Sequence, residues 1–277
     1  DSFSAIVEYE LSETVNLYAK AVEAYKSGGF NTRDPQLDGD EGAASDGIDY
    51  GVGFADGFGE EKAFTTELGI KSEWLDRRLR LNANVFQTDF DNMQMNFLLN
   101  GTVADTKVLN AGTASMQGFE FDLSVLLGDK IAASMEYAYL DAEITEVRDS
   151  QGNDVSYRYA FSAAPENSYT ASLDWHVWQG AKANLHLNVN TNFMDTRLGG
   201  GDVQNALTIM RSYQLWNARL SLTELEFASG EVSVALWGKN ILDKEYEIYA
   251  IDNLPHADRA VVWGEPRSIG MELSYHY

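Results

Sequence analysis

Apolar and polar residues alternate along most of this chain, and its last segment shows the pattern most clearly. In residues 267–277 one side of an extended strand carries Ile269, Met271, Leu273, Tyr275 and Tyr277, because successive side chains of a strand point to opposite faces. The pattern recurs along the chain in runs of roughly 10–20 residues, whereas strands of soluble proteins average about 5–6. This repetition indicates a sheet with lipid on one face and water on the other, as in an outer-membrane barrel.

The alternating runs, and the turn residues between them, predict about eleven strands. Their boundaries, defined to within about 2–4 residues, are 3–11, 14–27, 61–74, 78–97, 108–127, 131–147, 168–178, 182–194, 211–222, 231–246 and 266–277. Short connections alternate with long ones, and bacterial barrels place short turns at the periplasmic rim and long loops outside. The predicted fold class is therefore all-β, an antiparallel transmembrane β-barrel. Because an odd number of antiparallel strands cannot close on itself, we expect further strands upstream.

Charge and composition exclude several classes of function. The 277 residues include 43 acidic and 20 basic side chains, a net charge of −23, which repels phosphate backbones, so we expect no nucleic-acid partner. The absence of cysteine excludes disulfides and thiolate metal sites. No signal peptide is recognisable, and the first residues already have the pattern of a strand. We therefore expect residues 1–277 to be the C-terminal part of a single barrel domain whose N-terminal strands are missing.

Few residues suggest chemistry. His176 and His186 fall on the polar faces of adjacent predicted strands and could meet across the hairpin, but no nearby ligand spacing supports a metal site, so we interpret them as polar residues facing the lumen. The acidic loop 38–60 fails the EF-hand spacing, so we interpret it as a charged extracellular loop, with calcium as the alternative. We expect no catalytic residue, no resident metal and no cofactor, and hence not an enzyme.

The long loops hold the candidate ligand-binding residues. Tyr50, Phe54 and Phe58 could stack on a ring of a bound solute, or they could form a small cluster that folds the loop. Arg197 and Arg211 flank another loop and could hold an anionic ligand.

Seven aromatic residues fall near the ends of predicted strands or midway along them, and aromatic residues near strand ends fit the girdles of a membrane barrel. They are Trp74, Tyr137, Tyr139, Trp175, Trp178, Trp216 and Trp237. Tyr275 and Tyr277, in the terminal strand, are the candidate signal for membrane assembly.

Several segments, taken in order, resemble the C-terminal half of a TonB-dependent outer-membrane receptor. They are Tyr25-Lys-Ser-Gly-Gly-Phe-Asn31, Glu67-Leu-Gly-Ile-Lys71, Asn110-Ala-Gly112, Ala164-Pro-Glu-Asn167, Gly238-Lys-Asn-Ile-Leu-Asp-Lys-Glu-Tyr246 and Pro266-Arg-Ser-Ile-Gly270. The resemblance covers essentially the whole chain and implies a 22-stranded barrel, of which about eleven strands are present here, closed by a plug domain that lies upstream. The family usually ends on phenylalanine, whereas this chain ends on Tyr277.

The resemblance also implies a function. Such a receptor would import a scarce nutrient, such as siderophore-bound iron, cobalamin, a carbohydrate or an aromatic compound, through the outer membrane of a Gram-negative bacterium. Its expected partners are the TonB complex, reached through the missing plug, the barrel assembly machinery, membrane lipid and lipopolysaccharide, and a small-molecule ligand. The alternatives are a soluble β-rich carbohydrate-binding or adhesin module, and a passive porin.

Overall fold

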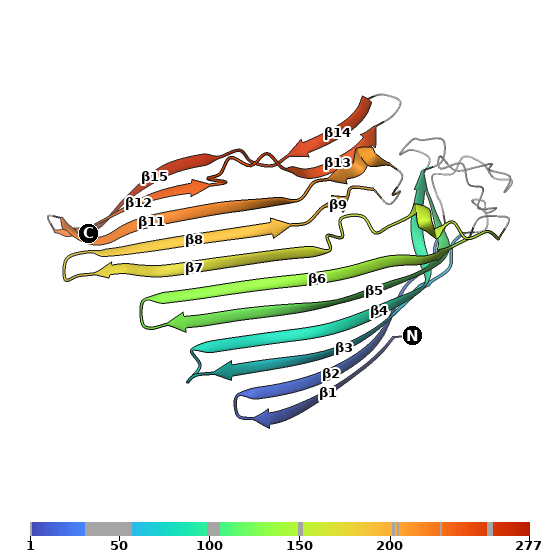
Figure 1. Cartoon of the computed structure of the whole chain (residues 1–277), viewed down its shortest axis with the longest axis horizontal. Coiled ribbons are helices and arrows are strands. Elements are labelled where there is room, and N and C mark those ends of the chain that lie inside the picture. The colour runs from blue at the N-terminus through green and yellow to red at the C-terminus, as the bar shows by residue number, and fades with distance from the viewer. Residues whose placement is uncertain are drawn as a thin grey trace.

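The computed structural model describes residues 2–30, 57–98, 106–148, 152–200, 203, 205–227, 229–253 and 257–277. Eleven strands form one antiparallel sheet in chain order, interrupted only by short elements (Figure 1). They are β1 (Phe3–Ser12), β2 (Val15–Lys26), β3 (Glu61–Trp74), β4 (Leu79–Leu98), β5 (Thr106–Leu127), β6 (Ile131–Val147), β7 (Asn167–Gln179), β8 (Asn184–Met194), β11 (Tyr213–Phe227), β12 (Gly230–Lys239) and β15 (Ser268–His276). The all-β class and the eleven antiparallel strands predicted from the sequence are confirmed.

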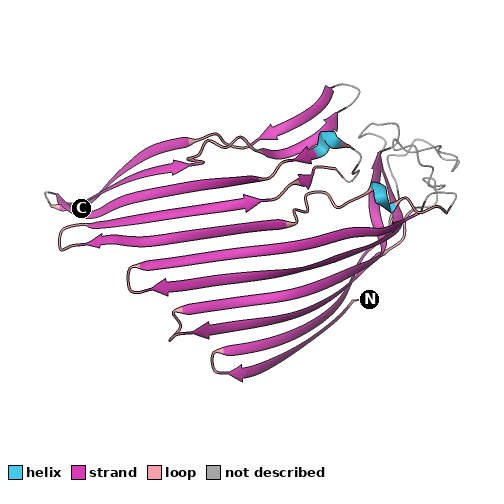
Figure 2. Cartoon of the chain, viewed as in Figure 1, coloured by secondary structure: helices cyan, strands magenta, loops and turns pink. Residues whose placement is uncertain are grey.

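Tight turns gather at one end of the sheet and longer connections at the other, as Figure 2 shows. The β3–β4 turn uses three successive left-handed residues, Leu75, Asp76 and Arg77, with φ of 56°, 55° and 66°. The β5–β6 turn uses Gly128, with φ of 66°, a conformation that glycine adopts without steric cost. We call these two ends the turn rim and the loop rim. The predicted sorting of short and long connections is confirmed.

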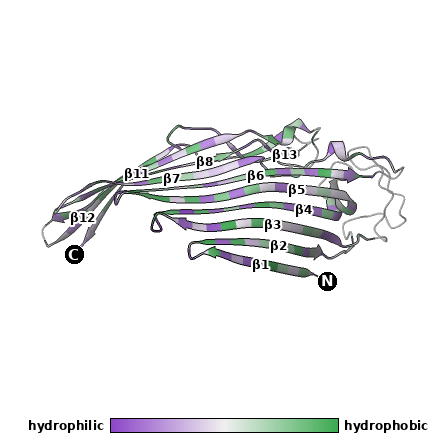
Figure 3. Cartoon of the chain, turned by 60° about the horizontal axis from the view of Figure 1, so that its bottom comes forward, coloured by the Kyte–Doolittle hydropathy of each residue, from purple (hydrophilic) through white to green (hydrophobic). Residues whose placement is uncertain are grey.

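Strand register places rows of side chains on the same face, because paired residues of antiparallel strands point the same way. Leu68 pairs with Val85, Val85 with Phe119, and Phe119 with Tyr139. We call this side the outer face and the opposite side the inner face. Leu68 and Val85 are 60% and 54% exposed, which is costly in water but not against lipid. Alternating hydrophilic and hydrophobic segments follow the strands in Figure 3.

The polarity of both faces reverses partway along β4, β5 and β6. Two residues beyond Phe119, the outer face carries the paired residues Gln117 and Asp141, joined by a hydrogen bond of 3.0 Å. On the inner face of the same segments, Ala114 and Ile144 are paired and only 3% and 5% exposed. On the turn-rim side of this level the outer face is apolar, whereas on the loop-rim side the inner face is apolar. A sheet in water has to cover its apolar face, whereas a sheet in lipid can leave its apolar face exposed. The change of polarity therefore marks the level at which the strands pass from hydrocarbon into water.

A loop folds over this upper part of the inner face. The core there comprises Met93, Leu109, Ala114, Ile144, Val147 and Val155, with Phe90, Met95, Tyr159 and Phe161 packed against it. Asp154 fixes the loop, because its Oδ1 accepts the backbone N–H groups of Ser156 at 3.0 Å and Val147 at 3.2 Å. These two N–H groups hold the pKa of Asp154 below its ordinary value.

Two predicted segments differ from the structure. The strand expected over 231–246 ends at Lys239, because Asn240 has φ of 46° and organises a turn. Its Nδ2 donates to the carbonyl of Lys244 at 2.8 Å, and its Oδ1 accepts the N–H of Lys244 at 2.9 Å.

The connection expected over 247–265 contains a hairpin of β13 (Glu247–Asn253) and β14 (Ala257–Trp263). Further short elements are β9 (Arg197–Leu198), β10 (Ile209–Met210), η4 (Ser156–Arg158) and η5 (Ala206–Thr208). None of the helices among the described residues is long and apolar enough to cross a membrane.

Candidate functional site

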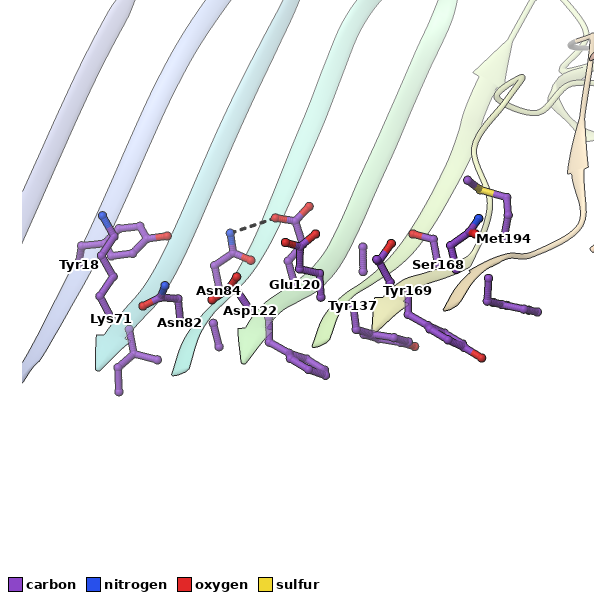
Figure 4. Close-up of a pocket in the computed structure, with 18 residues that line it drawn as sticks. Tyr18, Lys71, Asn82, Asn84, Glu120, Asp122, Tyr137, Ser168, Tyr169 and Met194 are labelled. Carbon is purple, nitrogen blue, oxygen red and sulfur yellow. Dashed lines mark hydrogen bonds between the residues drawn. The ribbon is translucent and has the colours of Figure 1, made fainter. Parts of the chain in front are cut away.

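A strip of polar side chains crosses the inner face from strand to strand (Figure 4). Lys71, Asn82, Asn84, Glu120 and Asp122 line a shallow pocket on this strip, together with Tyr18, Glu136 and Asn192. The register explains the alignment, because Lys71 pairs with Asn82 and Asn82 with Asp122. In the same view Tyr137 and Tyr169 point to the opposite side of the sheet.

Hydrogen bonds and ion pairs link the inner-face side chains of neighbouring strands. Glu67 is the centre of one group: it accepts from Tyr18 Oη at 2.5 Å and lies 3.6 Å from Lys20 Nζ. Asn84 bridges this group to Glu120, with contacts of 3.5 Å and 3.4 Å. The series continues toward β15 through Arg80–Asp122, Ser134–Ser172, Asn188–Asp174, Asn217–Asn190 and Arg219–Glu272. The inner wall therefore offers a polar solute charged and hydrogen-bonding groups on each strand from β2 to β11 and again on β15, with the last pair reaching across β12.

A second constellation lies at the loop rim and is centred on Glu247. Arg259 grips its carboxylate with two hydrogen bonds, Nη1 to Oε1 at 2.8 Å and Nη2 to Oε2 at 3.0 Å. The backbone N–H of Arg211 donates to Oε2 at 3.4 Å, and Arg197 Nη2 donates to the Glu247 carbonyl at 3.1 Å. Burial alone would raise the pKa of Glu247, but the hydrogen bonds and charge of Arg259, with the N–H of Arg211, outweigh it and lower that pKa.

The two predicted arginines therefore meet at one residue, Glu247, which the sequence did not indicate: Arg197 binds its backbone carbonyl, and the backbone N–H of Arg211 binds its carboxylate. Arg197 also lies over the ring of Tyr213, with its guanidinium carbon 5.5 Å from the ring centroid. Within the part of the chain that the structure describes, Arg197 Nη1 is buried without a hydrogen-bond partner. This guanidinium nitrogen is a spare donor, whereas Arg259, which sequence reasoning missed, makes four hydrogen bonds.

Of the three aromatic candidates in the first long loop, Phe58 alone lies among the described residues. Tyr50 and Phe54 lie outside the described residues, as does the acidic loop 38–60 up to residue 56. Phe58 forms an isolated antiparallel bridge with Gly29, with N–H···O distances of 2.9 Å and 2.8 Å. Its ring lies against Gly29, so that a Cβ added there would be 2.9 Å from the ring. This contact closes the base of the loop.

The seven aromatic residues considered for the girdles lie on both faces. The register puts Tyr139 in the outer row of Phe119, and Trp74 and Trp178 are about half exposed. Trp237 is an exception: it pairs with Gly270 on the inner face, where its indole would lie 2.4 Å from a Cβ at that position. It fills the space that glycine leaves, so it does not belong to a lipid girdle.

The structure also places the two terminal tyrosines and the two histidines that the sequence brought together. Tyr275 lies on the outer face, and the ring of the fully exposed Tyr277 is 6.3 Å from its ring. His176 and His186 are direct partners in the register. Among the described residues no group of three or more histidine, cysteine or acidic side chains is arranged to hold a metal.

Comparisons with known proteins agree with this architecture. A family model described as TonB dependent receptor-like, beta-barrel, matches residues 1–241. The ferric-pyoverdine M114 receptor PbuA of Pseudomonas sp. (strain M114) is 28% identical over 187 residues, which are 65% of this chain and 21% of that protein. The probable TonB-dependent siderophore receptor PiuA of Acinetobacter baumannii is 27% identical over 221 residues, which are 78% of this chain and 27% of that protein.

Solved structures show the same fold. The ferric yersiniabactin uptake receptor FyuA from Yersinia pestis matches 99% of this chain with a TM-score of 0.69, at 19% identity. The match covers 37% of that structure, so the chain corresponds to a part of such a barrel. The chain belongs to the TonB-dependent receptor family, a family of transport receptors and not of enzymes, and forms part of a β-barrel in the outer membrane of a Gram-negative bacterium.

Proposed function

We propose that the whole protein imports a ferric siderophore and that this chain supplies part of its barrel wall, inner surface and loops. The observation that carries the proposal is the polar inner wall, which extends from β2 to β11 and reaches β15 across β12, behind an apolar outer face. The similarity to two siderophore receptors along most of the chain supports the choice of solute. Such a solute is bulky and polar, and it needs a wetted route with many hydrogen-bonding groups.

The proposed mechanism has three steps. Extracellular loops and a plug domain capture the ligand, the TonB complex pulls on the plug from the periplasm, and the solute crosses along the inner wall. The plug and the remaining strands are proposed to belong to other parts of the same protein. A passive porin is the alternative, and it would work without an energy source.

Uptake in iron-limited cells tests this function. We expect deletion of the gene to abolish uptake of one radiolabelled ferric siderophore and to leave cobalamin and maltodextrin uptake unchanged. Uptake should also stop when TonB is removed or the proton gradient is collapsed. Continued uptake in de-energised cells would favour the passive porin, and unchanged iron uptake after deletion would refute the proposal.

Arg197 is the described residue best placed to contact an anionic ligand, since its Nη1 is buried without a partner. We expect Arg197→Ala to weaken binding of an anionic ferric siderophore by about tenfold, the effect of one lost charged hydrogen bond. Arg267→Ala is the matched control, because Arg267 pairs with Asp243 at 3.3 Å and is 47% exposed. Equal affinities of the two variants, measured by titration calorimetry, would remove Arg197 from the binding site.

The other candidate residues remain proposals. Tyr50, Phe54 and Phe58 are proposed to stack on the ligand, and Arg211 to complement its charge. Tyr275 and Tyr277 are proposed to be read by the barrel assembly machinery, with the apolar outer face in contact with lipid and lipopolysaccharide.

A further inference from the structure

Two histidines face each other on the inner wall near the turn rim. His176 of β7 pairs directly with His186 of β8, and their ring centroids are 4.9 Å apart. This stretch lies close to the short β7–β8 turn, away from the loop rim where the arginines gather (Figure 1). The proposed import function assigns no role to this pair.

The backbone brings the two imidazoles together. His176 N–H donates at 2.8 Å to the carbonyl of Lys130, on the edge of β7 that faces β6. In an antiparallel sheet the N–H and C=O of one residue point to the same edge, so His176 and His186 form a non-hydrogen-bonded pair, the narrow kind in which side chains approach most closely. Two imidazoles held in this way can direct one nitrogen each toward a single point.

A carboxylate lies beside the pair. Asp174 Oδ1 is 3.5 Å from His186 Nε2 and accepts a hydrogen bond of 2.9 Å from Asn188 Nδ2. The side chains of His186 and Asp174 are 32% and 43% exposed, so water and ions reach the site. A carboxylate that receives the second N–H of a histidine fixes the ring and makes its other nitrogen a better ligand.

We propose that His176 and His186 chelate one divalent transition-metal ion, with Asp174 acting as a positioning residue for His186. Imidazole suits Cu²⁺, Zn²⁺ and Ni²⁺, and Cu²⁺ binds most tightly of these. The protein supplies two ligands and water supplies the rest, which makes an open and exchangeable site. A ferric ion chelated by six donor atoms of a siderophore would not compete, since it has no vacant position for imidazole.

The test is Cu²⁺ titration of the purified protein in detergent, followed by electron paramagnetic resonance. We expect one equivalent to show nitrogen couplings from two imidazoles. His176→Ala and His186→Ala should each leave one coupled nitrogen and weaken binding at least about tenfold, since chelation is lost. Asp174→Asn should keep both couplings and weaken binding by about 10–100-fold, the usual effect of losing a carboxylate that orients a ligand.

His276→Ala is the matched control, because His276 also lies on the inner face but pairs with Glu231 on β12. It should change neither the spectrum nor the affinity. Heat-modified migration on gels checks that every variant is folded. Unchanged couplings and affinity in the folded His176→Ala, His186→Ala double variant, or a single coupled nitrogen in the unaltered protein, would overturn the proposal.

Discussion

At the scale of single residues, Glu247 is the most consequential side chain of the loop rim. Its carboxylate is only 10% exposed and its partner Arg259 is 28% exposed. Arg259 also donates to the carbonyls of Leu207 and Ile209, both at 2.6 Å. One buried ion pair thus ties the β13–β14 hairpin to the connection between β8 and β11.

This ion pair makes the anchoring of the hairpin dependent on pH. Because the pKa of Glu247 is lowered in the folded protein, the ion pair stabilises the hairpin fully above the ordinary glutamate pKa of about 4.3. The stabilisation is lost as pH falls through the lower, folded pKa. We expect hydrogen–deuterium exchange in 247–253 and 257–263 to be slow at pH 7 and pH 5 and to accelerate only in stronger acid, after correction for intrinsic rates.

Glu247→Gln should weaken the hairpin already at neutral pH. Breaking a buried pair leaves the guanidinium without its counter-charge, and the cost should be about 3 kcal/mol or less, because Arg259 stays partly solvated. The variant should also lose the acid dependence. The matched control is Glu272→Gln, whose partner Arg219 lies elsewhere and whose side chain is 57% exposed. Equal exchange in both variants would argue against the anchoring role.

At the scale of elements, the alternation along each strand assigns a solvent to each face. Leu187 lies on the outer face, paired with Leu220, and Asn188 lies on the inner face, paired with Arg219. We expect Leu187→Arg to lower the free energy of unfolding in lipid by about 1–2 kcal/mol, because the cost of a cation falls from about 2–4 kcal/mol at the bilayer midplane to about 0–1 near the interfaces and Leu187 lies toward the turn rim. Asn188→Arg should cost far less, since its side chain stays in water. Similar losses in denaturant titrations in lipid vesicles would contradict the assignment of faces.

The upper segments of β5 and β6 should respond in the opposite way. Ile144 is buried on the inner face, whereas its neighbour Glu143 lies on the outer face, paired with Ser115. Ile144→Ala should destabilise the packing of the loop over 152–161 by about 2–5 kcal/mol, as cavities in cores do, and limited proteolysis of that loop should accelerate. Glu143→Ala should leave cleavage unchanged. Faster cleavage in Glu143→Ala, but not in Ile144→Ala, would show that the core of this segment lies on the outer face and not on the inner face.

The strands could be predicted from the sequence because alternation is local, and β3, β4 and β6 begin or end within a residue or so of expectation. Two other features depend on distant partners. The end of β12 at Lys239 depends on Asn240, whose Nδ2 also donates at 3.1 Å to Glu265. The pairing of Glu247 with Arg259 joins residues that no spacing rule connects. The change of polarity along β5 and β6 can be followed in the sequence. Only the register, which pairs Gln117 with Asp141, shows that it occurs at the same level on neighbouring strands.

At the scale of the whole molecule, the apolar band runs obliquely across the strands. On β5 the edge of the band nearer the loop rim lies at Phe119. On β11 this edge lies at Trp216, and the polar Gln214 follows on the loop-rim side. The register links Phe121, Tyr137, Tyr169, Phe193 and Gln214 in a single outer row. This row therefore starts inside the band at Phe121 and ends outside it, toward the loop rim, at Gln214. Such an offset is expected when barrel strands tilt by about 35–45° from the membrane normal.

Single cysteines test this tilt directly, because the chain has no cysteine of its own. We expect a membrane-impermeant maleimide added to intact cells to label Gln214→Cys, which lies on the loop side of Trp216, and to leave Phe121→Cys unlabelled within the hydrocarbon. Both variants should react after denaturation, which controls for intrinsic reactivity. If strands ran parallel to the membrane normal, residues of one row would share one depth and would react alike. Equal labelling of the two positions would therefore contradict the oblique band, while leaving the register and the two faces intact.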